Sequence, residues 1–347
     1  MALPEKMHAV LLKEDGYSSS GEVSPTLENI GKFLEHAEID LPRLKPGQVL
    51  IRVIMASVNP SDTIFVQGYY GQPRVKGAPA GFEGVGQVVA GKGLYASYLK
   101  GKRVSFVAGP NGSGAWAEYA VADASGVIPL RKDVRNEDGA AMIVNPLTAS
   151  AMVDMVPEGG AFIATGGASQ LGKLMAGLAR STGRRLIAVA RRDEPLAHLK
   201  SLGAAHALNE RSESFQADLV AAIKAENPTV MLDAVAGSVS ARIFNAMPKD
   251  SRWVIYGKLA PELPEIQEPG KLIFMRQHIE GFWLVTWMSR TPFLRKIKTI
   301  RAVQARFASG QWKTDISTHV SLRNVMAELP AALAQPDGKV VITYDQG

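Results

Sequence analysis

The sequence predicts an α/β protein with two domains, one a small barrel of mostly antiparallel strands and the other a doubly wound parallel sheet of six strands. Short apolar runs between glycines fill residues 7–130 and are typical of a small barrel. Over residues 133–287, strand patterns alternate with amphipathic helix patterns, as in a parallel sheet with crossover helices. We therefore expect a barrel domain made of residues 1–130 and 288–347, and a sheet domain over residues 131–287.

Glycines divide the first region into short strand patterns. Nine of them fall from Gly81 to Gly114, where each apolar run is only a few residues long. Segment 18–45 carries no clear pattern, and we assign it no structure. The strands expected in this region cover residues 9–12, 49–53, 87–90, 103–107 and 115–121.

Six strand patterns in the second region are separated by helical ones, which gives five crossovers. After the last strand, two helices and a final strand return the chain to the barrel domain. The expected strands of the sheet cover residues 162–165, 186–190, 206–209, 230–233, 253–256 and 279–284. The returning elements are helices over 293–309 and 325–333 and a strand over 339–344.

The chain is basic, with a formal net charge of +6 and a pI near 9.4. Its basic residues are dispersed, and their densest cluster lies on the helix predicted over 293–309, so we expect no nucleic-acid partner. On that helix the apolar residues should face inward and the basic residues should face solvent. The apolar residues are Phe293, Leu294, Ile297, Ile300 and Phe307, and the basic ones are Arg295, Lys296, Lys298 and Arg301.

Cysteine is absent from all 347 residues, which excludes disulfides and every thiolate metal site. The longest uncharged run, residues 139–153, is interrupted by polar residues and proline, so no membrane-spanning segment is expected. The N-terminus has no charged stretch followed by an apolar core of the kind that directs secretion. We therefore expect a cytoplasmic protein.

A glycine-rich turn joins the first strand of the predicted sheet to the helix that follows it. Backbone N–H groups at such a turn can approach a pyrophosphate, and the helix N-terminus adds a partial positive charge. Ser169 stands where a middle glycine is usual and is expected to cap the helix or contact a phosphate. The predicted phosphate-binding residues are Gly166, Gly167, Ala168, Ser169, Gln170, Leu171 and Gly172, directly after Thr165.

The end of the second strand of the sheet should decide which dinucleotide binds. An acidic residue there would bind the adenosine ribose, whereas a basic residue would bind its 2′-phosphate. Arg191 and Arg192 occupy this position, so we predict NADPH rather than NADH. Asp193 follows directly and is interpreted as part of the start of the next helix, although it could instead favour NADH.

Several short motifs, in this order and spacing, resemble those of the zinc-free medium-chain dehydrogenase/reductase superfamily, of the quinone oxidoreductase and 2-enoyl thioester reductase kind. The resemblance covers nearly the whole chain and implies a GroES-like β-barrel catalytic domain and a Rossmann domain for NADP(H). It is less specific for the substrate. The motifs are residues 59–62 (NPSD), 67–71 (QGYYG), 81–86 (GFEGVG), 145–149 (NPLTA), 232–237 (LDAVAG), 256–257 (YG) and 281–284 (GFWL).

Two positions distinguish this chain from the zinc-dependent relatives, which have a cysteine at Asn59 and a histidine at Phe82. Neither residue can replace its counterpart as a zinc ligand, so no metal is expected. Glu83 is kept and is interpreted as a buried structural carboxylate. Without a Lewis acid, the natural reaction is the reduction of an already polarised conjugated acceptor.

The resemblance also implies the remaining site residues. Tyr70 resembles the tyrosine that acts in the enoyl reductases and would donate to the carbonyl oxygen as negative charge builds there; adjacent Tyr69 leaves the register open by one residue. Asn59 and Thr148 fall on segments that line the nicotinamide. Further cofactor-binding residues are Tyr256, Gly257, Phe282 and Trp283.

The leading hypothesis is an NADPH-dependent, metal-independent reductase of a 2-enoyl thioester, an α,β-unsaturated carbonyl or a quinone. Quinone reduction alone is the first alternative, and a non-catalytic NADPH-binding sensor or nucleic-acid-binding protein is an alternative of another class. The strand over 279–284 would expose an apolar sheet edge in a monomer, which predicts a homodimer.

Overall fold

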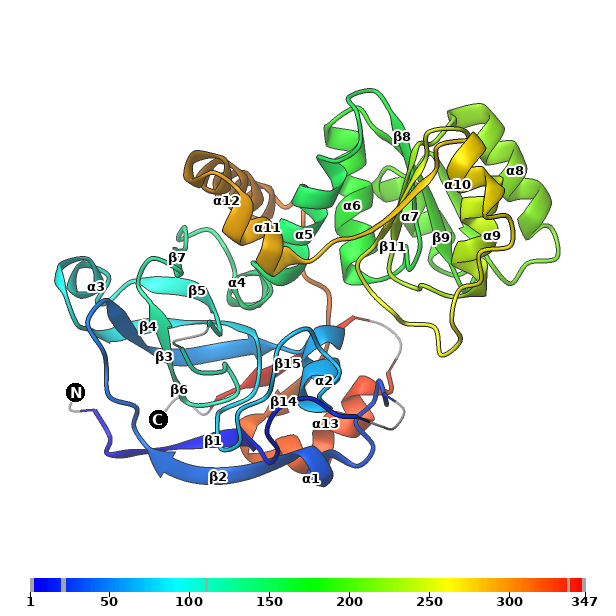
Figure 1. The fold of residues 1–347 in the computed structure, drawn as a ribbon. Helices are drawn as coiled ribbons and strands as arrows, with labels where there is room; N and C mark the ends of the chain where they lie inside the picture. Colours follow the sequence, from blue (N-terminus) through cyan, green and yellow to red (C-terminus); the bar gives the residue numbers. More distant parts are fainter. Residues whose placement is uncertain (1–2, 20–22, 110–111, 336–337, 345–347) are drawn as a thin grey trace. The chain divides into compact units, whose positions relative to one another are not determined.

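A computed structural model describes residues 3–19, 23–109, 112–335 and 338–344 (Figure 1). The chain forms two compact units, one of residues 1–144 with 304–347 and the other of residues 145–303. Both boundaries lie later in the chain than the sequence suggested. The first shift has a clear cause, because Asp138 Oδ1, on α4 (Asn136–Ala140), accepts a hydrogen bond of 2.8 Å from the Thr314 backbone and so ties this helix to the first unit.

The first unit is built on a sheet of seven strands in the order β14-β15-β3-β4-β5-β7, with β6 also paired to β3. All of its pairs are antiparallel except β14 with β15, in agreement with the predicted barrel. The strands are β3 (Gln48–Ser57), β4 (Glu83–Gly91), β5 (Arg103–Val107), β6 (Tyr119–Asp123), β7 (Ile128–Pro129), β14 (Ile316–Ser321) and β15 (Lys339–Thr343).

The segment to which no structure was assigned contains one strand of a separate two-stranded sheet. Strand β1 (Lys6–Leu12) pairs antiparallel with β2 (Leu34–Asp40) from Lys6 opposite Asp40 to Leu12 opposite Leu34. The short helices of the unit are α1 (Ile30–Phe33), α2 (Pro60–Val66), α3 (Leu94–Tyr98) and the 3₁₀ turn η1 (Leu322–Asn324), followed by α13 (Val325–Leu333).

The second unit contains the predicted parallel sheet of six strands, in the order β10-β9-β8-β11-β12-β13. The chain order reverses at β8, which lies between β9 and β11. The strands are β8 (Ala161–Ala164), β9 (Arg185–Ala190), β10 (His206–Asn209), β11 (Val230–Asp233), β12 (Arg252–Ile255) and β13 (His278–Gly281).

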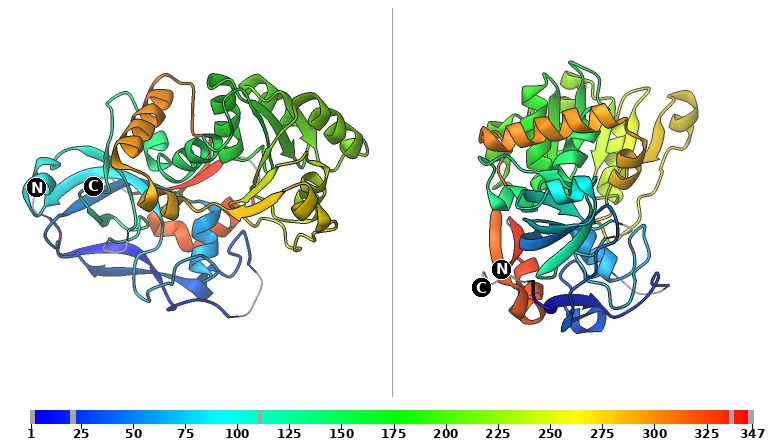
Figure 2. Two further views of the ribbon diagram at one scale, coloured as in Figure 1. Left: turned by 45° about the horizontal axis from the view of Figure 1, so that its top comes forward. Right: turned by 90° about the vertical axis from the view of Figure 1, so that its left-hand side faces the viewer.

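Helices cover both faces of this sheet (Figure 2). Helix α6 (Gln170–Ser181) contacts α7 (Leu196–Leu202), and α8 (Phe215–Glu226) contacts α9 (Ser238–Ala246). Ile163, Ile187 and Val189 pack with residues of α8 and α9, whereas alternate residues of the same strands point to the opposite face. The other helices are α5 (Val144–Val153), α10 (Gly270–Phe274), α11 (Leu284–Arg290) and α12 (Phe293–Ala308).

Two predictions for the end of the sheet domain were wrong. The last strand ends at Gly281, and Leu284 begins α11, so only the first half of the predicted strand over 279–284 is a strand. On α12, Phe293 and Leu294 are 70% and 80% exposed, although they were expected to face inward. Burial on this helix begins only in its later turns, where Val303 and Phe307 are 1% and 5% exposed. No helix among the described residues is both long enough and apolar enough to cross a bilayer.

Candidate active site

The glycine turn lies directly after β8, the strand at which the order of the sheet reverses, which is where sheets of this kind bind dinucleotides. Gly166 has φ +61, and the Gly167 backbone N–H donates to Val189 O at 2.8 Å. A Cβ added to Gly172 would lie 2.2 Å from Gly167 O, so only glycine lets α6 start this close to the turn. Ser169 caps the helix and accepts from Gly172 N at 3.1 Å. Gln170, Leu171 and Gly172 form the first turn of α6, at the helix N-terminus, which is a favourable position for an anion.

Asp233 holds together the strand ends around this turn. Its fully buried carboxylate accepts from Thr165 Oγ1, from Ser240 Oγ at 2.9 Å and from Trp253 Nε1 at 2.7 Å, and it also accepts from two backbone N–H groups of the following loop. These bonds join β11 to β8, α9 and β12. The sequence placed Asp233 in a family motif but gave it no role.

Tyr256 and Gly257 follow β12 at the same edge of the sheet. The Tyr256 hydroxyl is buried and has no hydrogen-bond partner among the described residues, and burial raises the pKa of this phenol above its ordinary value. A Cβ on Gly257 would lie 2.8 Å from Ala234 O. The buried Tyr256 hydroxyl, next to a glycine that leaves no room for a side chain, is consistent with a polar ligand bound at this edge of the sheet.

Arg191 and Arg192 lie in the exposed loop after β9, as predicted. Arg192 Nε is 3.9 Å from Glu194 Oε2, a distance at which an exposed ion pair is weak. Asp193 does not begin the next helix. Its carboxylate instead accepts from Asn209 Nδ2 at 2.9 Å, which holds it against the end of β10.

Thr148, Phe282 and Trp283 lie on other parts of the second unit. Thr148 is buried on α5, and Trp283 is 37% exposed at the N-cap of α11. Phe282 and Trp283 line an open groove of about 610 Å³.

In the first unit, Asn59 is the centre of a buried polar cluster at the start of α2. Its Nδ2 donates to Glu83 Oε1 at 3.0 Å, and its Oδ1 accepts from Lys339 Nζ at 2.5 Å. Glu83 also accepts from Ser57 Oγ at 2.9 Å and from the backbone of Ile143 and Val144 at 3.1 and 2.9 Å. Glu83 is therefore a structural carboxylate, as interpreted from the sequence.

Two charged groups of this cluster have shifted pKa values because they are buried. Asp62 accepts from the backbone N–H groups of Asn59 and Phe82 at 2.8 and 2.7 Å, yet burial raises its pKa to about 7. Burial lowers the pKa of the Lys339 ammonium, while the nearby carboxylates of Glu83 and Asp62 oppose the shift. The cluster therefore holds two acids and one base in a space closed to water.

Tyr70 packs beside this cluster. Its ring centroid is 5.1 Å from that of Phe82 and 6.5 Å from that of Phe65, in tilted and edge-on arrangements. The loop that carries Tyr70 is held by Arg74, whose buried guanidinium donates to Glu14 at 2.8 Å. Gly68, with φ +85, allows the close approach, because a Cβ there would lie 2.6 Å from that guanidinium.

Comparison with known proteins identifies the family. Residues 45–132 match the alcohol dehydrogenase GroES-like domain, and residues 171–299 match the zinc-binding dehydrogenases. A candidate NADPH:quinone reductase from Mesorhizobium loti, known from its crystal structure, is 52% identical with a TM-score of 0.93, and the match covers 99% of this chain and 100% of that one. The chain belongs to the medium-chain dehydrogenase/reductase superfamily.

Within this superfamily the chain is of the quinone and enoyl reductase type. Human mitochondrial enoyl-acyl-carrier-protein reductase is 28% identical over 319 residues, which cover 87% of this chain and 82% of that protein. The mitochondrial 2-enoyl thioester reductase Etr1p/Etr2p heterodimer from Candida tropicalis shares the fold, with a TM-score of 0.80 at 24% identity over 98% of this chain and 100% of that chain.

Some superfamily members bind zinc, but the residues here do not fit that metal. Phe82 presents a ring without a donor atom, and the amide oxygen of Asn59 is already bonded to an ammonium, which would repel a dication. No group of three potential metal-ligating side chains occurs in the described part of the chain.

Three residues that shape the site were missed by the sequence analysis: Asp62, Arg74 and Lys339. Each is charged and buried, with an exposed fraction of 0 to 5%. A charged residue in a sequence usually indicates a surface position, so composition gave no signal for them. The spacing of Asp62 from Asn59 is a signal that could have identified Asp62, since an acid three residues after an N-cap residue is a known helix-capping pattern.

Proposed function

We propose that this protein is an NADPH-dependent, metal-independent oxidoreductase that transfers a hydride to an activated conjugated acceptor. The acceptor class is a 2-enoyl thioester, an α,β-unsaturated carbonyl or a quinone. The observation that carries the choice of reaction is the contact of Lys339 with Asn59, because it sets an ammonium against the side chain that stands where the zinc-dependent relatives have a metal ligand. The curated relatives are enoyl reductases, which supports the first acceptor.

The cofactor would be held by the glycine turn and the strand ends around it. Residues Gly166, Gly167, Ala168, Ser169, Gln170, Leu171 and Gly172 would receive the pyrophosphate, since their backbone lies at a helix N-terminus. Arg191 and Arg192 would bind the 2′-phosphate. Thr148, Tyr256, Gly257, Phe282 and Trp283 would contact the remainder of the dinucleotide.

The bound cofactor would supply the hydride, and the chain must stabilise the negative charge that then builds on the acceptor oxygen. Tyr70 is the proposed donor, since a phenol can supply a hydrogen bond or a proton to that oxygen, an effect worth roughly a hundred- to ten-thousand-fold in rate. Tyr70 packs against Phe82, whose backbone N–H donates to the same Asp62 carboxylate as the N–H of Asn59, which supports this choice over Tyr69. Asn59 would orient the acceptor or the nicotinamide, with its amide fixed by Glu83 and Lys339.

Quinone reduction is the second candidate, favoured by the 52% identity to the Mesorhizobium loti protein. Stopped-flow NADPH oxidation with crotonyl-CoA and with 9,10-phenanthrenequinone, run in parallel, separates the two. Turnover of the thioester but not of the quinone is the expected result. Activity on neither acceptor would contradict the proposal and favour a non-catalytic NADPH-binding protein.

We also propose a homodimer. Strand β13 is the free edge of the parallel sheet, with Ile279 40% exposed, and Ile273 and Phe274 on neighbouring α10 are 70% and 80% exposed. An apolar sheet edge of this kind is normally covered. Light scattering at micromolar concentration should give twice the mass of the chain, and a monomer would refute the proposal.

The proposed compartment is the cytoplasm. The absence of cysteine agrees with a reducing environment without requiring one. Cell fractionation with an antibody against the protein would test this.

A further inference from the structure

Tyr70 lies in a loop of residues 68–73, and the two ends of this loop are joined by a residue from a distant part of the sequence. The hydroxyl of Ser18 donates to Gln67 O at 2.6 Å, before the loop, and accepts from Arg74 Nη2 at 3.2 Å, after the loop. A single hydroxyl therefore bridges the base of the loop.

Arg74 uses every nitrogen of its guanidinium at this base. Besides the bond from Nη2, Nε donates to Gly16 O at 3.2 Å, and Nη1 donates to Val66 O at 3.2 Å. Nη1 also donates to Glu14 Oε2 at 2.8 Å. The side chain of Arg74 is 2% exposed. Burial of a charged group is costly unless hydrogen bonds compensate it, and the planar fork of a guanidinium makes such bonds directional.

Residues 14–18, which follow β1, form a strap across the base of the loop. In addition to the side-chain bonds, the backbone N–H of Gly16 donates to Arg74 O at 3.0 Å, and the N–H of Arg74 donates to Gly16 O at 3.1 Å. The N–H of Ser18 donates to Gly68 O at 2.9 Å. The strap is thus bonded to the chain on both sides of Tyr70.

The ring of Tyr70 is held less sharply than the base of its loop. Its neighbours Phe82 and Phe65 meet it in tilted and edge-on arrangements, at centroid distances of 5.1 and 6.5 Å. Aromatic contacts of this kind are weaker and less directional than charge-assisted hydrogen bonds. The place of the phenol is therefore set mainly by the backbone that the strap and Arg74 hold.

We propose that Arg74 is a positioning residue, which fixes the loop on the strap and thereby sets the place from which the Tyr70 hydroxyl donates to the acceptor. The hydrogen bonds of its guanidinium go to the strap and to α2, so Arg74 acts through Tyr70 and not on the acceptor. A displacement of about 1 Å in a reacting group can lower a rate roughly a hundredfold. The inference rests on the proposed function, in which Tyr70 is the donor.

A double-mutant cycle tests whether Arg74 acts through Tyr70. R74K keeps the charge but loses the fork, so kcat with crotonyl-CoA should fall about tenfold or more, with the Kd for NADPH unchanged. The double variant R74K/Y70F should turn over as slowly as Y70F alone. An equal relative loss in both backgrounds would overturn the inference. S18A, which removes only the bridging hydroxyl, serves in the same cycle where R74K does not fold.

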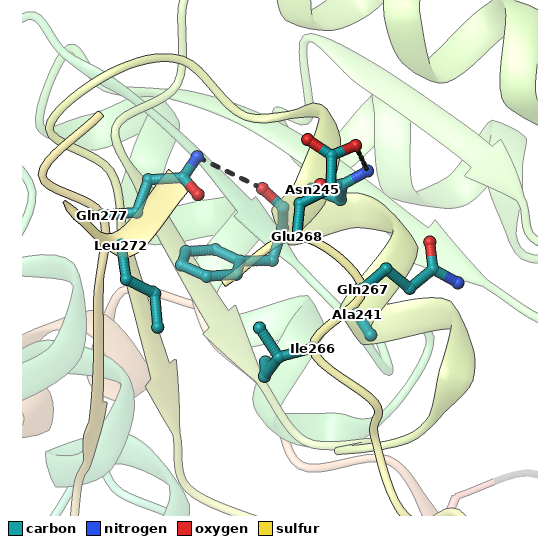
Figure 3. Close-up of a pocket in the computed structure, with 8 residues that line it drawn as sticks. Ala241, Asn245, Ile266, Gln267, Glu268, Leu272 and Gln277 are labelled. Atoms are coloured by element: carbon teal, nitrogen blue, oxygen red, sulfur yellow. Dashed lines mark hydrogen bonds between the residues drawn. The ribbon is translucent and has the colours of Figure 1, made fainter. Parts of the chain in front are cut away.

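Gln277 offers a control for a loss of stability alone. This buried side chain precedes β13 and donates to Met247 O at 3.0 Å and to Phe244 O at 3.5 Å, beside a small hollow that Ile266 also lines (Figure 3). Q277M removes a buried donor from backbone carbonyls, at the edge of the sheet opposite to the proposed cofactor site. The melting temperature should fall and kcat should not. A fall in kcat equal to that of R74K would overturn the inference.

Fluorine NMR of the protein labelled with 3-fluorotyrosine follows Tyr70 without any turnover. The signal that is missing in Y70F identifies Tyr70 among the eight tyrosines of the chain. R74K should shift this signal, and Q277M should leave it in place. A shift in R74K without turnover of any acceptor by the wild-type protein would leave Arg74 assigned as the residue that places Tyr70 and the proposed function wrong. Turnover by the wild-type protein with an unshifted signal in R74K would overturn the inference alone.

Discussion

The ammonium of Lys339 lies 2.5 Å from Oδ1 of Asn59, although the two residues are 280 positions apart in the sequence. This contact joins β15 to the start of α2, and Glu83 on β4 bonds to the other end of the same amide. The amide of Asn59 is thereby held on both sides, so its orientation in the proposed site is fixed by charged partners.

Lys339→Met should destabilise the protein, because it removes the hydrogen bond from the ammonium to Asn59 Oδ1 and the attraction of the ammonium to the carboxylates of Glu83 and Asp62. Leaving a buried acceptor without its donor typically costs about 1–3 kcal/mol. Urea unfolding at pH 7.5 measures the loss, and Lys100→Met, an exposed lysine, is the control with an expected change of less than about 0.5 kcal/mol. Equal effects of the two substitutions would contradict the account of the cluster.

Asp62→Asn should change how stability depends on pH. The pKa of Asp62 is raised from 3.8 to about 7, so between these values the folded protein holds a proton that the unfolded chain has released. Raising the pH through this window therefore removes stability at this site, at a rate of up to about 1.4 kcal/mol per pH unit. Asparagine does not titrate, so the free energy of unfolding of Asp62→Asn relative to wild type should rise from pH 5 to pH 7.

The control for this pH dependence is Asp133→Asn. The exposed Asp133 has a pKa lowered by its hydrogen bond to Arg131, so both folded and unfolded chains have lost this proton well below pH 5. The difference in free energy of unfolding between Asp133→Asn and the wild-type protein should be the same at pH 5 and pH 7. If the difference in free energy of unfolding between Asp62→Asn and wild type is also the same at pH 5 and pH 7, Asp62 is ionised in the folded protein over this range, which contradicts the prediction.

Gly172→Ala should disturb the predicted phosphate site. The added Cβ would lie 2.2 Å from Gly167 O, so α6 or the turn must move, at a cost of about 1–3 kcal/mol. NADPH should bind more weakly as well, as isothermal titration calorimetry would measure. In contrast, a Cβ on Gly31 meets no atom within 4 Å, and Gly31→Ala should leave both quantities nearly unchanged. Unaltered NADPH affinity in Gly172→Ala would count against the assignment of this turn.

Replacing Arg191 and Arg192 by alanine should weaken NADPH binding by roughly ten- to a hundred-and-fifty-fold, because charge-assisted bonds to the 2′-phosphate are lost. The Kd for NADH should not change. Lys200→Ala, on exposed α7, controls for the loss of local positive charge. The same Kd for both dinucleotides in the wild-type protein would refute the predicted preference.

The parallel sheet could be predicted from the sequence, because its four central strands are nearly continuous apolar runs. β8 and β11 are buried at every position, and a run of four such residues between turn signals is hard to mistake. Strand β2, with the sequence LEHAEID, was missed because its charged and polar residues conceal a strand that is only partly covered. The predicted end of the last strand was wrong because the apolar pattern continues past Gly281 through Trp283, Leu284 and Val285, which lead into a helix.

The residues of the candidate site also fall into two groups, those that a local sequence pattern predicts and those that it does not. The glycine turn is a local pattern, and the structure places it after β8 with Ser169 as the cap. Lys339, Asp62 and Arg74 acquire their roles only when distant segments meet, as in the 60 positions between Glu14 and Arg74. No local property of the sequence separates a lysine buried on β15 from the partly or fully exposed lysines of α12.

Tyr70→Phe tests the central claim most directly. Stopped-flow NADPH oxidation with crotonyl-CoA should show kcat lowered by roughly a hundred- to ten-thousand-fold, with the Kd for NADPH nearly unchanged, because the phenol acts on the acceptor and not on the cofactor. Tyr69→Phe, one residue away, should retain most of the activity. Full turnover in Tyr70→Phe, or a loss of turnover confined to Tyr69→Phe, would contradict the assignment of Tyr70 as the group that donates to the acceptor.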